Sequence, residues 1–178
     1  MNTLELDEKL ILRMAEGDND AFGDLYRQTS GAVYGFALSI LRNAHDAENV
    51  MHDAYLRMHR SAAAYQPMGK PMAWVLTIVR NLCYTMLTNG DMCEDISAYD
   101  SLLHCSDQEQ TVDRMVLQKA LEVLPFEDRQ IVILHALTGM KHREIAEILE
   151  LPLGTVLSKY KRSLEKMRKE IEVKGEES

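Results

Sequence analysis

Apolar residues recur at steps of three and four along most of the chain, which is the spacing of one face of an α-helix. Leu6, Leu10 and Met14 begin a first helix that stops at Gly17. A second stripe lies in residues 44–62, at Ala47, Val50, Met51, Ala54 and Met58. The sequence has neither the alternating pattern of a β-strand nor a long internal repeat. The pattern therefore predicts an all-α fold.

Capping residues and helix breakers set the expected boundaries in the N-terminal half. Asp18 is a suitable N-cap for a helical segment through Arg42, and Ser30-Gly31 predicts an interruption within it. The loop 66–71 contains two prolines and a glycine and precedes a further helix over 72–88. The residues that this further helix is expected to bury are Trp74, Ile78 and Leu82.

The C-terminal part of the chain has the pattern of a helix-turn-helix unit, in which a short helix and a tight turn precede a longer helix. Pro125 suits the first turn of a helix, and Gly139 suits the position after a helix ends. The expected helices are 112–123, 125–138, 142–149 and 154–171, with the tight turn at 150–153.

The last of these helices separates apolar from polar residues. Its apolar stripe comprises Val156, Tyr160, Leu164, Met167 and Ile171. Its other side carries hydroxyls near the N-terminus and cations along its length: Thr155, Ser158, Lys159, Arg162, Lys166 and Lys169. The second helix of such a unit enters the DNA major groove, where hydroxyl, Lys and Arg side chains meet bases and phosphates. Periodicity alone leaves a solvated surface helix as the alternative.

Charge is distributed unevenly along the 178 residues. The formal net charge is −8, yet residues 91–112 carry six acidic and no basic side chains, whereas residues 113–178 carry twelve of each. We therefore expect two small helical domains, 1–90 and 113–178, joined by an acidic linker over 91–112. The alternative is an irregular connection that packs on one domain through Leu102-Leu103.

Composition and motifs exclude several classes of protein. The sequence lacks an apolar run of the ~20 residues that a membrane span needs, and its start is acidic rather than signal-like, so we expect a cytoplasmic protein. Three cysteines without a CxxC pair, and histidines seven residues apart at His45, His52 and His59, do not have metal-ligand spacing. Phosphate-loop, HExxH and GxSxG motifs are missing, so we expect no catalytic residue, metal or cofactor.

Two stretches together resemble one protein family. The C-terminal stretch LPFEDRQIVILHALTGMKHREIAEILELPLGTVLSKYKRSLEKMRKEI resembles the fourth region of extracytoplasmic-function (ECF) sigma factors. The upstream stretches DAFGDLYRQTSGAVYGFALSIL, DAENVMHDAYLRMHR and AWVLTIVRNL resemble the second region of the same family, in the right order. The matches cover about residues 18–88 and 113–171.

The resemblance implies a promoter-specificity subunit of bacterial RNA polymerase. In that family the second region docks on the core enzyme and opens the downstream promoter box, while the fourth region reads the upstream box. Such a subunit catalyses no reaction. Its implied partners are RNA polymerase core, promoter DNA and an anti-sigma factor. The competing hypothesis is a sigma-like regulator that binds polymerase or another regulator without opening promoters.

The resemblance also implies roles for individual residues. The residues that match the polymerase-docking helix are Asp46, Glu48, Asn49, Asp53, Tyr55 and Leu56. The residues that match those contacting the melted strand are Arg80 and Asn81. Thr155, Ser158, Lys159, Arg162 and Lys166 fall on the helix that binds the upstream box. The alternatives are a solvated acidic face for the first set and an intramolecular salt bridge for Arg80.

Several positions depart from the family pattern. The family has basic residues after the Arg80-Asn81 pair, whereas this chain reads LCYTMLTNGDMCED, so we expect a weak grip on DNA there. Lys141 replaces a serine N-cap, and Glu150 replaces a glycine in the turn. Pro152 and Leu157 replace a serine and a basic residue of the last helix.

Overall fold

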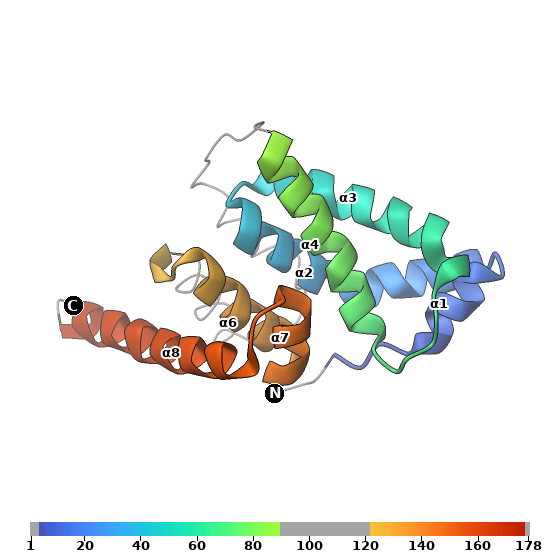
Figure 1. The fold of residues 1–178 in the computed structure, drawn as a ribbon. Helices are drawn as coiled ribbons and strands as arrows, with labels where there is room; N and C mark the ends of the chain where they lie inside the picture. Colours follow the sequence, from blue (N-terminus) through green and yellow to red (C-terminus); the bar gives the residue numbers. More distant parts are fainter. Residues whose placement is uncertain (1–3, 90–121, 177–178) are drawn as a thin grey trace. The chain divides into compact units, whose positions relative to one another are not determined.

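The computed structural model describes residues 4–89 and 122–176, and all regular structure within these ranges is helical (Figure 1). They belong to two compact units, which we call the N-terminal module (4–89) and the C-terminal module (122–176). The all-α class and the two helical domains predicted from the sequence are confirmed. The predicted linker, 91–112, and nearly all of the helix predicted over 112–123 lie outside the described residues.

The N-terminal module is built around one central helix. Its elements are α1 (Glu8–Ala15), α2 (Asn19–Leu41), α3 (Ala44–Ser61), the 3-10 turn η1 (Ala62–Ala64) and α4 (Pro71–Asn89). Helix α2 contacts α1, α3 and α4, and its residues 32–41 are buried without a break. A helix that is buried all round is enclosed by its neighbours, so α2 organises the core of this module.

The interruption predicted near Ser30-Gly31 is wrong, because α2 continues through both residues. A glycine inside a helix costs roughly 0.5–1 kcal/mol relative to alanine. Burial of the mainly apolar residues 32–41 that follow offsets that cost.

The N-cap of α2 agrees with the sequence prediction. The Asp18 carboxylate accepts hydrogen bonds from the backbone N–H groups of Asp20 and Ala21, at 2.9 and 3.2 Å.

The buried stripe of α4 is also different from the predicted one. Trp74, Ile78 and Leu82 are only partly buried, and the Trp74 ring meets the Tyr65 ring edge to face with centroids 5.1 Å apart. Helix α4 packs against both α2 and α3, and the side chains that it buries instead are Met72, Val75, Leu76, Val79 and Cys83. Leu82 is thereby left at the edge of the α3–α4 contact.

The C-terminal module contains α6 (Phe126–Thr138), α7 (His142–Leu149) and α8 (Leu153–Glu176), which contact one another pairwise. Gly139 ends α6 with φ 65°, as predicted from its position. The core of the module comprises Ile131, Ile133, Leu134, Ile145, Ile148, Leu149, Val156 and Met167. Within the described ranges, no helix is both long enough and apolar enough to cross a membrane.

Candidate nucleic-acid interface and docking groove

The turn between α7 and α8 has the geometry of a helix-turn-helix unit. Glu150 adopts the left-handed conformation with φ 57°, and the N–H of Leu151 donates to the carbonyl of Ala146 at 3.0 Å. The Pro152 carbonyl then accepts the N–H groups of Thr155 and Val156, at 2.9 and 3.1 Å, and starts α8. The residue that replaces the family's glycine therefore does occupy a positive-φ position, at a cost of about 1–2 kcal/mol.

The N-terminus of α7 is capped from inside the helix. Lys141 has no side-chain oxygen with which to accept a backbone N–H, but the Glu144 carboxylate accepts the Lys141 N–H at 2.9 Å. This is one half of a capping box. It compensates in part for the serine that Lys141 replaces.

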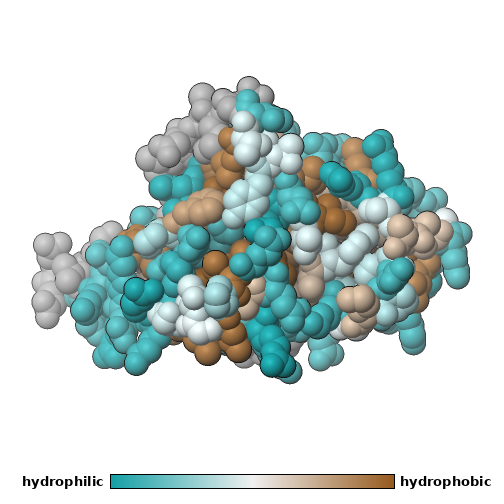
Figure 2. Space-filling view, viewed as in Figure 1, coloured by the Kyte–Doolittle hydropathy of each residue, from teal (hydrophilic) through white to brown (hydrophobic). Residues whose placement is uncertain are grey.

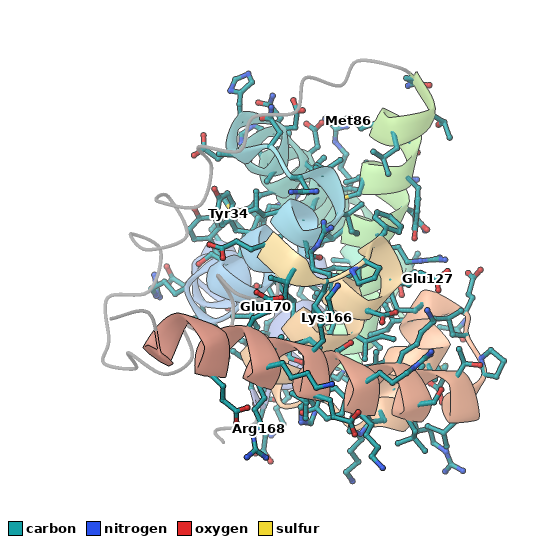
Figure 3. All side chains as sticks on the ribbon, turned by 90° about the vertical axis from the view of Figure 1, so that its left-hand side faces the viewer. Tyr34, Met86, Glu127, Lys166, Arg168 and Glu170 are labelled. Atoms are coloured by element: carbon teal, nitrogen blue, oxygen red, sulfur yellow. The ribbon has the colours of Figure 1, made fainter. Side chains whose placement is uncertain are left out.

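Three of the residues predicted to contact the upstream box are exposed along α8. Ser158, Arg162 and Lys166 are exposed, and Thr155 is partly buried. Figure 2 shows a mainly hydrophilic surface toward the C-terminal end of α8, and Figure 3 marks Lys166 on that helix. The Arg162 guanidinium lies back on its own helix, donating to the Ser158 carbonyl at 3.3 Å. This arrangement presents hydroxyls and cations on one face, a set that can bind phosphates and base edges.

Lys159 differs from these residues because its ammonium is paired within the module, and its contact with the upstream box stays a prediction. Its ammonium lies 2.8 Å from Oδ1 of Asp128 and 3.1 Å from Oε2 of Glu127, both at the start of α6. The hydrogen bond to Asp128 and the two negative charges raise the pKa of Lys159. The ammonium is thus engaged inside the module.

The apolar stripe of α8 was predicted one position out of place. Leu164 is 42% exposed, whereas Ser163 is 1% exposed and takes the buried position between Val156 and Met167. Each step of four residues turns a helix by about 40° beyond a full circle, so two steps from Val156 bring Leu164 about 80° away. The Ser163 hydroxyl donates to the Lys159 carbonyl at 2.8 Å, which satisfies it inside the module.

A cluster of aromatic rings joins the three helices of this module, and the sequence patterns did not single it out. The imidazoles of His135 and His142 stack with centroids 4.8 Å apart, and the Tyr160 ring meets both edge to face. Nδ1 of His135 is hydrogen-bonded to the Met140 carbonyl at 2.8 Å. Burial, and secondarily the charge of His135, lower the pKa of His142. The cluster packs the short α7 between its neighbours.

A groove between α3 and α4 contains most of the predicted polymerase-docking residues. It consists of two hollows of about 380 and 450 Å³ that share Asp53 and Leu82. The first is lined by His45, Asp46, Asn49, Val50, Asp53, Leu82, Thr85, Met86 and Asn89, and the second by Asp53, Leu56, Arg57, Arg60, Ser61 and Leu82. Figure 3 marks Met86 toward the C-terminal end of α4. We call these two hollows the α3–α4 groove.

The groove has acidic and apolar portions. Asp46 and Asp53 are two turns apart on α3, where Leu56 is 42% exposed, and Leu82 and Met86 are half-buried on α4. Carboxylates beside exposed apolar side chains suit a partner that presents cations around an apolar ridge.

Two residues of the predicted docking set lie elsewhere. Glu48 is exposed but does not line the groove. Tyr55 is 4% exposed, and its hydroxyl shares a 2.7 Å hydrogen bond with Thr29 on α2. Burial raises its pKa. The Tyr55 side chain is packed in the core, where it supports α3 against α2, and a docking role for this residue stays a prediction.

The pair predicted to meet the melted strand is split between two environments. Asn81 is exposed, but Arg80 is half-buried, with its guanidinium carbon 4.9 Å from the centroid of the Tyr84 ring one turn along α4. The structure therefore gives Arg80 a cation–π contact with Tyr84 on its own helix.

Comparison with known proteins identifies both modules. The model of sigma-70 region 2 matches residues 25–91, and that of sigma-70 region 4 matches residues 114–167. "ECF RNA polymerase sigma factor SigK" of Mycobacterium sp. strain KMS is 29% identical over 172 residues, which cover 88% of this chain and 86% of that protein. "ECF RNA polymerase sigma factor SigW" of Bacillus subtilis is 25% identical over 181 residues, covering 92% and 96%.

Solved structures show the same fold. CnrH, solved in complex with the cytosolic domain of CnrY, superposes with a TM-score of 0.67 at 20% identity, covering 94% of this chain and 97% of that one. RpoE, solved with the anti-sigma factor NepR from Bartonella quintana, gives 0.66 at 20% identity, covering 85% and 97%. The matches to sigma-70 region 2 and then region 4 define the class of the protein, a transcription initiation factor. The chain belongs to the sigma-70 family, among its ECF sigma factors.

Proposed function

We propose that this protein is an alternative sigma factor that binds core RNA polymerase in the cytoplasm and directs it to specific promoters. The observation that carries the proposal is the presence of regions 2 and 4 in order on one chain, with ECF sigma factors as relatives over nearly its full length. The protein itself catalyses no reaction, and its binding energy drives promoter opening. The proposal includes no catalytic residue, metal or cofactor.

Core polymerase docks on the α3–α4 groove in this proposal. Asp46 and Asp53 pair with cations of the partner, and Asn49 supplies an uncharged hydrogen-bonding group between them. Leu56 and Leu82 contribute apolar area at the centre of the contact. Acidic groups at the rim of an interface mainly accelerate association and select the partner, whereas buried apolar contacts hold it.

Promoter DNA is bound at two places. Thr155, Ser158, Arg162 and Lys166 on α8 contact the upstream box, with phosphate contacts fixing the position and hydroxyls reaching base edges. Arg80 and Asn81 on α4 meet the melted strand. Since residues 81–89 include no Lys or Arg, this second contact contributes little counterion release and grips DNA weakly.

Run-off transcription with core polymerase and a library of genomic fragments tests the proposal. The full chain is expected to produce start sites that core enzyme alone does not. A double variant, Arg162→Ala with Lys166→Ala, is expected to bind core enzyme normally while those start sites weaken or disappear. A library that yields no start site dependent on the chain contradicts the proposal.

A second function is favoured by one observation, the absence of basic residues after Asn81 within α4. A sigma-like regulator would bind polymerase, or another regulator, without opening DNA. Permanganate footprinting separates the two functions, because it reports unstacked thymines in an open promoter. Tight binding to core enzyme with no reactive thymine at any bound fragment would favour the second function.

Control by an anti-sigma factor is part of the proposal. RpoE of the comparison above was solved with its anti-sigma factor NepR, and CnrH with the cytosolic domain of CnrY. A protein partner that covers either the α3–α4 groove or the polar face of α8 would block polymerase or promoter binding. Purification of the tagged chain from its host, followed by mass spectrometry, is expected to recover such a protein in addition to polymerase subunits.

A further inference from the structure

We propose that Glu127 and Asp128, at the start of α6, hold Lys159 against their own helix, which withdraws this cation from DNA and fixes α8 in place. In this inference Asp128 and Glu127 are positioning residues for the DNA-binding helix, and Lys159 is their anchor. The part that concerns DNA rests on the proposed function, and the contact within the module does not.

The geometry shows one cation held by two carboxylates. Oδ1 of Asp128 lies 2.8 Å from the Lys159 ammonium, and Oε2 of Glu127 lies 3.1 Å from it. The other Asp128 oxygen, Oδ2, lies 3.5 Å from the Ser163 hydroxyl oxygen, whose proton is donated to the Lys159 carbonyl. Lys159 and Ser163 are one turn apart on α8, so a single carboxylate contacts two successive turns of the helix (Figure 3 marks Glu127).

Burial makes this contact costlier to break than an ordinary surface pair. The Asp128 side chain is 13% exposed and that of Lys159 is 21% exposed, whereas Glu127 is 51% exposed. Exposed pairs contribute about 0–1 kcal/mol, but removing one partner of a poorly solvated pair leaves an uncompensated charge. Asp128 is therefore the main partner, and Glu127 adds a second negative charge from the solvent side.

The two acids also occupy a favourable place on their own helix. Both lie in the first turn of α6, where the helix dipole stabilises negative charge. Their positions are thus set by α6 itself. A DNA phosphate that approached Lys159 would have to displace two carboxylates that are already held in position, one of which is largely buried.

Arg162 provides the contrast on the same helix. It is exposed and contacts only a carbonyl of α8, at 3.3 Å, among the contacts described for it. A cation that is solvated before binding releases counterions from a phosphate when it binds, whereas one already neutralised by carboxylates adds little. The two cations should therefore differ in how they affect the salt dependence of DNA binding.

Fluorescence anisotropy with a labelled duplex, titrated with the full chain at several salt concentrations, measures that difference. The logarithm of the affinity falls with the logarithm of the salt concentration by about 0.9 for each phosphate contact. Arg162→Ala is expected to lower this slope by about 0.9. Lys159→Ala is expected to leave the slope unchanged, and a loss of slope equal to that of Arg162→Ala overturns the inference.

Releasing Lys159 is expected to have the opposite effect. The double variant Glu127→Gln with Asp128→Asn should raise the slope by about 0.9 and tighten binding, and adding Lys159→Ala should abolish that gain. Glu165→Gln, which removes one exposed negative charge from α8 itself, is a control for net charge and should leave the slope unchanged. A gain that persists without Lys159 would show that it comes from net charge and would overturn the inference.

A second measurement requires no DNA. Amide hydrogen exchange of residues 153–164 in the full chain is expected to become faster by the same factor in Asp128→Asn and in Lys159→Ala, with no further change when both are combined. Lys159→Arg, which keeps the charge, should restore slow exchange. If the exchange rate of the combined variant is raised by the product of the two single factors, Asp128 and Lys159 act independently, and the inferred contact between α6 and α8 is overturned. If the chain binds no DNA but the two effects do not add, the proposed function fails and the positioning role stands.

Discussion

Glu8 on α1 accepts a hydrogen bond from the hydroxyl of Tyr65 at 2.5 Å, although 57 residues separate the two along the chain. The same oxygen, Oε1, accepts the backbone N–H groups of Met68 and Gly69, each at 3.0 Å. One carboxylate thus ties the loop between α3 and α4 to the first helix. Three donors to one oxygen favour the ionised form of the carboxyl and so lower the pKa of Glu8. The hydrogen bond from the Tyr65 hydroxyl has the largest effect.

The loop should therefore loosen in acid. A carboxyl whose pKa is lower in the folded state contributes stability that is present above its ordinary pKa of 4.5 and is lost as the pH falls through the folded value. We expect the hydrogen-exchange protection factors of the Met68 and Gly69 amides to fall below pH 4.5, after correction for the intrinsic exchange rates. Glu8→Ala should produce the same protection loss at neutral pH. Protection of these amides that does not respond to the substitution would contradict the contact.

Charge in the α3–α4 groove should decide binding to core polymerase. Asp53 borders both hollows, so Asp53→Lys places a repulsive cation at the centre of the contact, and we expect an affinity loss of about tenfold or more, equivalent to about 1.4 kcal/mol. Biolayer interferometry with immobilised core enzyme measures it. Glu16→Lys makes the same change of charge at an exposed residue beside α1 and should have little effect.

Tyr55 distinguishes support from contact in the same assay. Its hydroxyl is bonded to Thr29 inside the module, so Tyr55→Phe should lower the free energy of unfolding by about 1 kcal/mol and leave polymerase affinity unchanged. A tenfold loss of affinity in this variant, with the fold intact, would return Tyr55 to the docking surface.

Two long apolar residues of α8, Met167 and Leu164, should differ sharply in their effect on stability. Met167 is 4% exposed and Leu164 is 42% exposed, although the sequence placed both on one stripe. We expect Met167→Ala to cost about 2–5 kcal/mol of unfolding free energy, and Leu164→Ala to cost about 0.5 kcal/mol or less. Urea denaturation followed by the circular dichroism of the full chain gives both values. Equal costs would support the stripe that the sequence predicted.

The sequence predicted helix type and order well because helical periodicity and end signals are local. Gly17, Asp18 and Gly139 act within a few residues of where they stand, and each marks the expected boundary. The predicted stripe of α8 is wrong at one position, because steps of three and four each drift from the true helical repeat. Over eight residues that drift exchanges Leu164 for Ser163.

Contacts between distant residues account for the remaining differences. Lys159 was placed on the open face because its helical position is close to it, but its partners are 31 and 32 residues earlier in the chain. Tyr55 was assigned to the surface by resemblance, while its partner Thr29 lies on another helix. The residue pattern of one segment does not show which side chains of other segments form an ion pair with its charges or a hydrogen bond with its hydroxyls.

The ring cluster of the C-terminal module should make that module sensitive to mild acid. The pKa of His142 is lowered chiefly by burial and then by His135, whose ring is stacked on it, while the facing group on α8 is the uncharged phenol of Tyr160. A base whose pKa is lower in the folded state takes up its proton more readily when unfolded, so stability declines as the pH falls below its ordinary value of 6.5.

We therefore expect amides of α7 to lose hydrogen-exchange protection between pH 6.5 and pH 5, beyond the change in intrinsic rate, while amides of α2 in the other module keep theirs. His142→Phe, which preserves an aromatic ring against His135 and Tyr160, should remove most of this dependence. His45→Gln changes an exposed histidine of α3 and is the matched control. If the dependence survives in His142→Phe, another group is responsible, and the stacked pair is only a packing contact.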